Sequence, residues 1–437
     1  MASKHSSSSQ VYKFEPINVG RWLIWGLFAL VLISAPLVFT SSLGQMILTQ
    51  MGIVIIICLS YNILLGQGGM LSFGHAVYSG LGSFVAMHTL NAITAGSFLL
   101  PVSLVPLVGG LAGLFFAALF GSVTVKTAGT PFAMITLGIG ELIWAMSLIF
   151  PGFFGGEAGV SGNRIAGSSS FGITFGPQIQ LYYLSAFYLF ICTALMFAFT
   201  RTPLGRILNA VRDNPERVEF VGYDTERVRY IAFMVAGFFA GIGGAIAALH
   251  FEIVTSENVS GARSTVYLLW TFLGGATFFF GAIIGGVMAV LAFVMFSELT
   301  KAWLLYLGLL FLFMVMYAPG GFAGLIMMNL RVAAFGFLRK LWVSYLALGV
   351  TAMVALLGAS VMIEMIYHLQ FDGALGDELK FLSMTFNAKN FDIWFGSGFL
   401  MLTGLGLFEL CRKQFLQEWG EIQEDIENEI KRRQALS

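Results

Sequence analysis

The sequence predicts an all-α membrane protein, a polytopic transmembrane helical bundle with about ten spans and one re-entrant hairpin. Of its 437 residues, 57% are hydrophobic and only 11% are charged, whereas soluble domains carry roughly 25% charged residues. No Asp, Glu, Lys or Arg occurs from Trp22 to Val125, a stretch with room for several crossings of about 20 residues each. These long unbroken runs indicate helices, because a membrane barrel would alternate over segments of about ten residues.

Several classes of protein are excluded or disfavoured by composition and motifs. The net charge is zero, so we expect no nucleic-acid partner, which would select a basic surface. The three cysteines lie far apart in apolar segments and imply neither a disulfide framework nor a metal site. The chain lacks a phosphate-binding loop and the hydrolase motifs His-Glu-x-x-His and Gly-x-Ser-x-Gly. We therefore expect no catalytic residue, no metal and no cofactor on this chain.

Apolar blocks follow one another along the whole chain, separated by short polar connections. The expected spans are residues 22–40, 46–65, 71–90, 98–124, 131–150, 181–200, 230–250, 302–319, 342–366 and 393–411, with the hairpin at 266–296. The first of these follows a polar segment without a cleavage pattern, so we expect an uncleaved span and not a signal peptide.

The distribution of basic residues predicts the orientation. The N-terminal segment carries Lys4, Lys13 and Arg21, and the 201–229 loop carries six arginines. Short loops rich in Lys and Arg face the cytoplasm, and six expected crossings separate the two segments, so their parity agrees. Both chain termini are then expected in the cytoplasm.

The block at 266–296 is long enough for one span, but a single crossing would place the basic residues after it outside. Its interior contains Gly274, Gly275 and Thr277, which favours a broken helix that enters, turns and leaves on one side. Irregular backbone at such depth is tolerated inside protein or beside a water-filled cavity. We therefore predict a re-entrant hairpin here.

The C-terminal tail after Arg412 predicts an amphipathic helix. Its apolar residues recur at spacings of three and four, namely Phe415, Trp419, Ile422, Ile426 and Ile430. Two interpretations stay open: a helix resting on the membrane surface or on its own protein, and a docking helix for a cytoplasmic partner.

Polar residues inside the second and third apolar blocks are candidates for a translocation path. Gln67, Ser72 and His75 lie in a glycine-rich stretch, and small and polar residues there allow close helix approach or line a pore. The alternative is plain helix packing with a satisfied buried histidine.

Glu141 lies midway through another span and is a further path candidate, since intramembrane carboxylates usually face a bundle interior or a wet cavity. A carboxyl group that bridges two helices is the alternative for Glu141.

Two loops carry distinct signals. The segment 155–163 is glycine-rich and polar; it is interpreted either as a flexible linker or as an external gate or docking surface.

The cytoplasmic segment 202–224 contains residues that start and end helices, which a loop that is merely solvated would not need. Thr202 before Pro203 predicts a helix start, and Pro215 should end that helix and begin a second. We interpret two short charged helices between spans as a surface that pushes on, or is pushed by, another protein.

Several motifs together resemble those of a known family. The resemblance is carried by the Asn62–Gly82 segment, by Pro203-Leu204-Gly205-Arg206 and Arg212-Asp213-Asn214, and by Leu273-Gly274-Gly275 followed by Ala318-Pro319-Gly320. In this order they are similar to the permease subunit of branched-chain amino acid ABC importers, of the M type. The similarity covers about three quarters of the chain, residues 22–328.

The resemblance implies a permease core at 22–330 with a coupling loop at 201–229, preceded by a cytoplasmic segment at 1–21. It implies a second homologous permease, two ATP-binding subunits that hold ATP and Mg, a periplasmic substrate-binding protein, and a location in the bacterial inner membrane. Arg206, Arg212 and Asp213 would contact an ATP-binding subunit, next to Asn214, and Pro203 and Gly205 would shape the turn. Two additional spans at 331–411 and the tail at 412–437 have no counterpart in the family pattern.

The implied substrates are leucine, isoleucine and valine, although relatives that carry urea or short amides share these motifs. The alternative class is an ion-coupled secondary transporter. Such carriers use deep acidic and basic pairs, which the spans of this chain lack.

Overall fold

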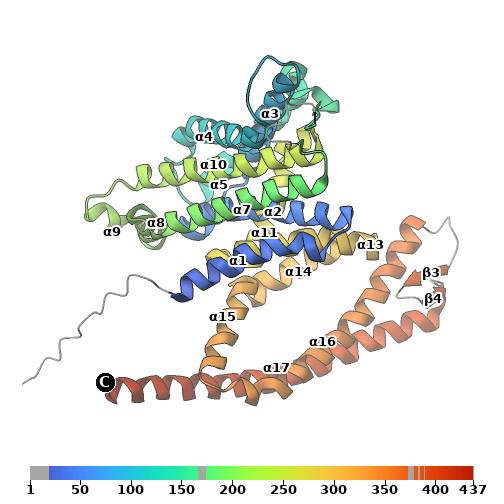
Figure 1. Ribbon diagram of the computed structural model, residues 1–437. Coiled ribbons are helices and arrows are strands. Elements are labelled where there is room, and N and C mark those ends of the chain that lie inside the picture. Colours follow the sequence, from blue (N-terminus) through green and yellow to red (C-terminus); the bar gives the residue numbers. More distant parts are fainter. Residues whose placement is uncertain (1–18, 166–173, 373–377, 382–383, 388, 437) are drawn as a thin grey trace, which may run out of the picture.

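The computed structural model describes residues 19–165, 174–372, 378–381, 384–387 and 389–436 (Figure 1). It confirms the all-α class: long helices run roughly side by side, and the described strands form only two short antiparallel pairs. In β1 (Val160–Ser161) and β2 (Ile253–Val254) two distant loops pair antiparallel, and β3 (Glu378–Phe381) pairs with β4 (Met384–Asn387).

The helices of the first part of the chain are α1 (Val19–Val38), α2 (Ser42–Asn62), α3 (His75–Thr94), α4 (Val105–Thr124), α5 (Thr130–Ile149), α6 (Pro151–Phe154), α7 (Gln178–Arg201), α8 (Pro203–Asp213), α9 (Pro215–Phe220) and α10 (Thr225–Phe251). Those of the second part are α11 (Gly261–Gly274), α12 (Phe279–Leu291), α13 (Ser297–Leu299), α14 (Trp303–Tyr317), α15 (Gly321–Ala334), α16 (Leu338–Tyr367) and α17 (Phe391–Leu436). Wider π-helical turns extend α2 over Ile63–Gln67 and α12 over Ala292–Phe296.

Eight helices of the described chain are long and apolar enough to cross a membrane, or up to nine if the bent pair α14 and α15 is one span. All of the expected blocks fall on helices. The short apolar part of α1, Trp22–Val38, and the more polar α3, which carries His75 and His88, are not among the eight. The fold is therefore that of a multi-pass membrane protein.

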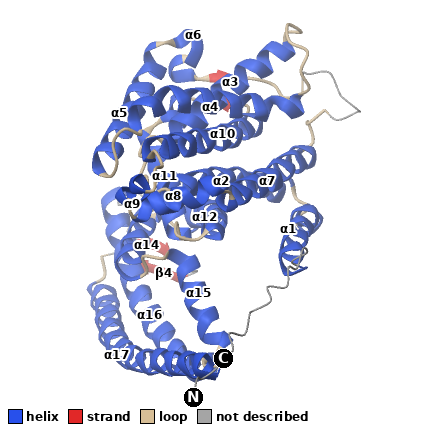
Figure 2. Cartoon of the chain, turned by 90° about the vertical axis from the view of Figure 1, so that its left-hand side faces the viewer, coloured by secondary structure: helices blue, strands red, loops and turns tan. Residues whose placement is uncertain are grey.

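The core of the bundle is built from helices that approach very closely (Figure 2). Helix α10 packs against α2, α3 and α4, and α2 also packs against α7 and α12. At the crossing of α4 and α10, a Cβ atom on Gly241 would lie 2.3 Å from the carbonyl oxygen of Gly109. Two backbones therefore touch there, which is how membrane helices associate through small residues.

The 266–296 block forms a helical hairpin with α11 and α12 as its two limbs. Since α12 with its π-helical turn, Phe279–Phe296, is itself long and apolar enough to cross a membrane, a re-entrant course stays a prediction. Gly275 reverses the chain with φ 114°, a backbone conformation that favours glycine. The limbs are antiparallel: Gly274 packs against the backbone of Gly281 and Gly285, and Gly285 also packs against Trp270. Because the chain turns back on itself, the block is not one straight crossing.

Helices α16 and α17 form an antiparallel arm that stands apart from the bundle, with β3 and β4 at its tip (Figures 1 and 2). Only 11% of each span in the arm is buried within this chain, against 72% for α2 and α10. The tail predicted at 412–437 continues the last span without a break in the single 46-residue helix α17. Its apolar stripe packs on α15 and α16, with Ile426 fully buried against Val332 and Leu341. Of the two interpretations of the tail, the structure shows a helix resting on its own chain.

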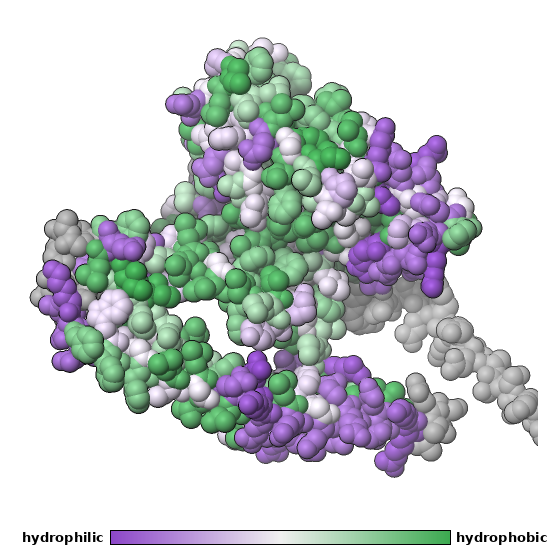
Figure 3. Space-filling model, turned by 180° about the vertical axis from the view of Figure 1, so that it is seen from behind, coloured by the Kyte–Doolittle hydropathy of each residue, from purple (hydrophilic) through white to green (hydrophobic). Residues whose placement is uncertain are grey.

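Hydrophobic side chains cover the flanks of the bundle, and hydrophilic ones gather at its ends (Figure 3). One such end carries α8 and α9, and the C-terminal end of α17 lies on the same side (Figure 1). We call this the α8 end. The other end, which carries β1, β2 and the start of α7, is called the opposite end.

Candidate functional site

The 202–224 segment folds as two capped helices, as its turn chemistry predicts. The Thr202 hydroxyl accepts a hydrogen bond from the backbone N–H of Gly205, with Pro203 at the first helical position of α8. Helix α8 ends at its C-cap residue Asn214, whose backbone N–H donates to the carbonyl oxygen of Ala210. The Asn214 side chain caps α9 by accepting a hydrogen bond from the N–H of Arg217, with Pro215 at the first position of α9. Such caps satisfy backbone donors that a helix start leaves free.

Helix α8 has one face on the bundle and one face free. Leu208 and Val211 are buried in the main core cluster, and a Cβ on Gly205 would lie 2.3 Å from the carbonyl oxygen of Phe199, so α8 packs tightly under α7. Arg206 is exposed. At the end of α9 Phe220 is 90% exposed, an unusual environment for a large apolar side chain.

The inner face of α8 rests on the π-helical extension of α2. The Asn209 amide donates to Oε1 of Gln67 at 3.0 Å, and the Arg212 guanidinium donates to the carbonyl oxygen of Gly66. We call these four residues the inner contact. Arg212 also pairs with Asp213 at 3.0 Å, with side chains 33% and 67% exposed. Arg212 therefore faces inward, while Asp213 remains available at the surface.

The inner contact continues into the hairpin. The Asn62 side chain, one turn before Gly66, donates to the carbonyl oxygen of Ala276 at 2.6 Å. Gly66 itself packs against that carbonyl. Gly274 and Gly275 are buried at this turn, and Thr277 is exposed on it. The turn of the hairpin and helix α8 thus hold the same short segment of α2 from two sides.

The path candidates lie in three different places. Gln67 is 8% exposed and belongs to the inner contact. Ser72 and His75 are completely buried, and His75 Nε2 lies 2.9 Å from the Ser60 hydroxyl. Within the described residues, His75 Nδ1 and the Ser72 hydroxyl have no hydrogen-bond partner. Their environment is that of packed core, and a role of these three residues in a path stays a prediction.

Glu141 lies on α5, exposed on the flank of this chain. Its carboxylate approaches the first residue of α11, where a Cβ on Gly261 would lie 2.7 Å from Oε1. A helix N-terminus stabilises negative charge nearby. The Glu141 carboxylate therefore lies beside the start of α11. A carboxyl group that bridges two helices and a role in the path both stay predictions.

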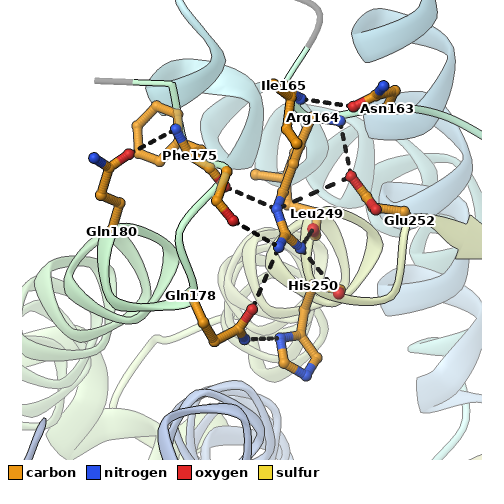
Figure 4. Close-up of polar contacts among 10 residues, drawn as sticks. Asn163, Arg164, Ile165, Phe175, Gln178, Gln180, Leu249, His250 and Glu252 are labelled. Carbon is orange, nitrogen blue, oxygen red and sulfur yellow. Dashed lines mark hydrogen bonds and ion pairs between the residues drawn. The ribbon is translucent and has the colours of Figure 1, made fainter. Parts of the chain in front are cut away.

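At the opposite end, one arginine fastens the 155–163 loop region to two helices (Figure 4). The Arg164 guanidinium donates to the carbonyl oxygens of Phe175, Gly176, Leu249 and His250 and to the Gln178 side chain. Its backbone N–H donates to Glu252. We call Arg164, Gln178, His250 and Glu252 the outer cluster. The Arg164 side chain is only 12% exposed.

The sequence gives little sign of the outer cluster, because its members are single residues on separate segments. Together with the pairing of β1 and β2 and the bond from Asn91 to the Ser161 carbonyl, the cluster fixes the loop region in place. The described part of this loop is therefore held to neighbouring segments by hydrogen bonds. A flexible linker and an external gate or docking surface both stay predictions. Among the described residues no group of three His, Cys, Asp or Glu side chains is arranged to hold a metal.

The family model that matches this chain covers most of the bundle and ends before the arm. A family model described as branched-chain amino acid transport system / permease component matches residues 45–320. The high-affinity branched-chain amino acid transport system permease protein LivM of Salmonella typhimurium is 27% identical over 317 residues, 68% of this chain and 73% of that protein. Its Escherichia coli counterpart is 25% identical over the same shares.

A more distant relative is the galactose/methyl galactoside import permease protein MglC of Escherichia coli, 27% identical over 56% of this chain and 75% of that protein. No solved structure matches the chain significantly. The relatives are transport permeases, and the family model covers α3 to α14 completely. The chain therefore belongs to the family of permease components of branched-chain amino acid transport systems.

Proposed function

We propose that this chain is the membrane-spanning permease subunit of an ATP-binding-cassette importer that carries leucine, isoleucine and valine across the bacterial inner membrane. Its partners are a second homologous permease, two ATP-binding subunits that hold ATP and Mg, and a periplasmic substrate-binding protein. The α8 end, with both termini, faces the cytoplasm, and the opposite end receives substrate.

The observation that carries this proposal is the position of α8 and α9. They project from the α8 end with Arg206, Asp213 and Phe220 exposed, while their inner face holds the end of α2. A separate subunit that pushes on α8 would move Gln67 and Gly66 and, through Asn62, the turn of the hairpin. Such a contiguous chain of packed groups carries conformational coupling between distant sites.

The substrate assignment follows the names of the LivM relatives. Relatives with other substrates, such as MglC, share the fold, and urea or short amides are the alternative within the family. The binding protein selects much of what such an importer receives. The neighbouring genes and a transport assay therefore say more about the substrate than the permease does.

The test is uptake of labelled leucine by vesicles that contain all proposed subunits. We expect uptake to need ATP and the binding protein, and excess unlabelled isoleucine or valine to compete where urea does not. Uptake driven by an ion gradient without nucleotide would contradict the importer. Competition by urea alone would contradict the substrate.

A matched pair of variants tests the coupling surface. Arg206→Glu reverses an exposed charge on α8, and we expect it to abolish most ATP-dependent uptake while the bundle stays folded, because like charges opposed at an interface cost several kcal/mol. Arg432→Glu reverses an exposed charge on the tail and should leave uptake near the unmodified level. Equal uptake by both variants would remove Arg206 from the coupling surface.

A further inference from the structure

A cavity of about 180 Å³ lies between α2, α10, α11 and α12, in the half of the bundle away from α8. Gln50, which lines it, precedes Gln67 by 17 positions on α2, about 25 Å at the helical rise. Ala247 and Phe251, at the far end of α10, line another side. The two limbs of the hairpin open onto this cavity, whereas their turn lies at the inner contact.

The cavity is lined by both polar and apolar side chains. Its polar lining is contributed by Gln50, Asn258, Arg263 and Tyr267, and its apolar lining comes largely from Ile53, Val54, Ala289, Val290 and Phe293. Within the described chain, Arg263 supplies the charge in this lining. A ligand that fits is small, carries one negative group, and has an aliphatic remainder.

The Arg263 guanidinium is incompletely satisfied. Its backbone is fixed, because its N–H donates to the Ser260 cap at 3.2 Å. Its Nη2 lies 3.8 Å from Glu257, and the two side chains are 37% and 75% exposed. The Nε atom of Arg263 is buried and has no hydrogen-bond partner among the described residues. Arg263 stands two residues after the first residue of α11, so its guanidinium reaches the cavity from the helix start. A guanidinium binds a carboxylate through two parallel hydrogen bonds.

From these observations we infer that the cavity binds the solute in transit, with Arg263 holding its carboxylate and Val54, Val290 and Phe293 holding its aliphatic side chain. This inference rests on the proposed function and deepens it, since it assigns part of the substrate recognition to the permease. Because hairpin α11–α12 joins the cavity to the inner contact, movement of α8 would alter the cavity that holds the solute.

The first test measures leucine uptake per ATP hydrolysed in the complete transporter, at saturating binding protein. Arg263→Gln should lower this ratio about tenfold, as expected for losing one charge-assisted pair, and Arg263→Lys should recover part of it. Arg432→Gln makes the same chemical change at an exposed tail position and should leave the ratio unchanged. An unchanged ratio for Arg263→Gln, with the unmodified transporter active, would overturn the inference.

The second test does not depend on transport. Val54→Cys places a thiol in the cavity of the complete transporter, with Cys411 replaced by serine; Cys58 and Cys192 are buried. Excess isocaproate, a carboxylate with the leucine skeleton, should slow labelling by a small thiol reagent, and isocaproamide should not. Arg263→Gln should abolish that protection. Equal protection by acid and amide would overturn the inference, whereas a transporter that moves no leucine but retains acid-specific protection would overturn only the proposed substrate.

Discussion

Two arginines join segments that are distant in the chain, Arg164 at the opposite end and Arg212 at the α8 end, and they do so very differently. Arg164 is 12% exposed and donates to five acceptors on three segments. Arg212 is 33% exposed, donates to one backbone carbonyl, and is paired with the exposed Asp213 beside it. The outer cluster is therefore a fixed joint, and the inner contact is held by few bonds.

This difference matches what an importer driven from one side requires. The end that receives force must move with low cost, and elements that move are drawn from the less stable parts of a structure. The opposite end must keep α7 and α10 aligned while the other end shifts. The comparison thus predicts that changes at the outer cluster affect stability, whereas changes at the inner contact affect coupling.

The largest expected effect follows from Arg164→Met. Losing the guanidinium leaves several buried carbonyl oxygens and Gln178 without their donor, and breaking such a buried charged network costs about 3–5 kcal/mol. We expect little folded protein after detergent extraction and a much lower melting temperature for what remains. Arg227→Met removes an arginine that is 85% exposed, and it should melt like the unmodified chain. A normal melting temperature for Arg164→Met would show that the outer cluster is no fixed joint.

For Gly69→Ala we expect a smaller loss of stability than for Arg164→Met, but a clear loss of coupling between ATP hydrolysis and uptake. Gly69 has φ 64°, and a Cβ there would lie 2.7 Å from Cγ of Arg212. Gly96→Ala is the matched control, because Gly96 has φ 72° and open space around it. Both substitutions cost about 1 kcal/mol of backbone strain, but only Gly69→Ala displaces α8.

The measurement is leucine uptake per ATP hydrolysed, together with the melting temperature. We expect both glycine variants to lose similar stability and only Gly69→Ala to lose coupling. Equal coupling in the two variants would mean that Arg212 moves aside freely and that the inner contact transmits no force.

Local features of the structure were predictable from sequence, and distant pairings were not. The caps at Thr202 and Asn214 depend on neighbouring residues, so their chemistry is visible in the chain itself. The bond between Gln67 and Asn209 joins positions 142 residues apart, and neither residue carries a signal that names the other. The sequence predicts Gln67 in a translocation path. The structure places it against α8, and its role in a path stays a prediction.

The continuous helix α17 illustrates another limit. The sequence changes from apolar to charged residues near Arg412, but neither glycine nor proline occurs between residues 407 and 419 to end a helix there. Composition thus indicates where the surroundings of the chain change, and not where a helix ends.

The contacts of Arg164 are not predictable from sequence for a related reason: its acceptors are mostly backbone carbonyls, which are the same in every sequence.

The smallest effect is expected for the amide pair of the inner contact, tested by Gln67→Met, Asn209→Leu and the double variant. Each single change leaves a part-buried amide without its partner, which costs about 1 kcal/mol, whereas the double change removes both polar groups and costs less than the two single changes added together. Melting temperatures and uptake per ATP hydrolysed in all four proteins give the interaction between the two positions. If the single losses add in the double variant, Gln67 and Asn209 act independently. If coupling falls in each single variant and partly returns in the double variant, the hydrogen bond between α2 and α8 transmits force. Because this bond is weak, the α8 end can move while Arg164 holds the opposite end.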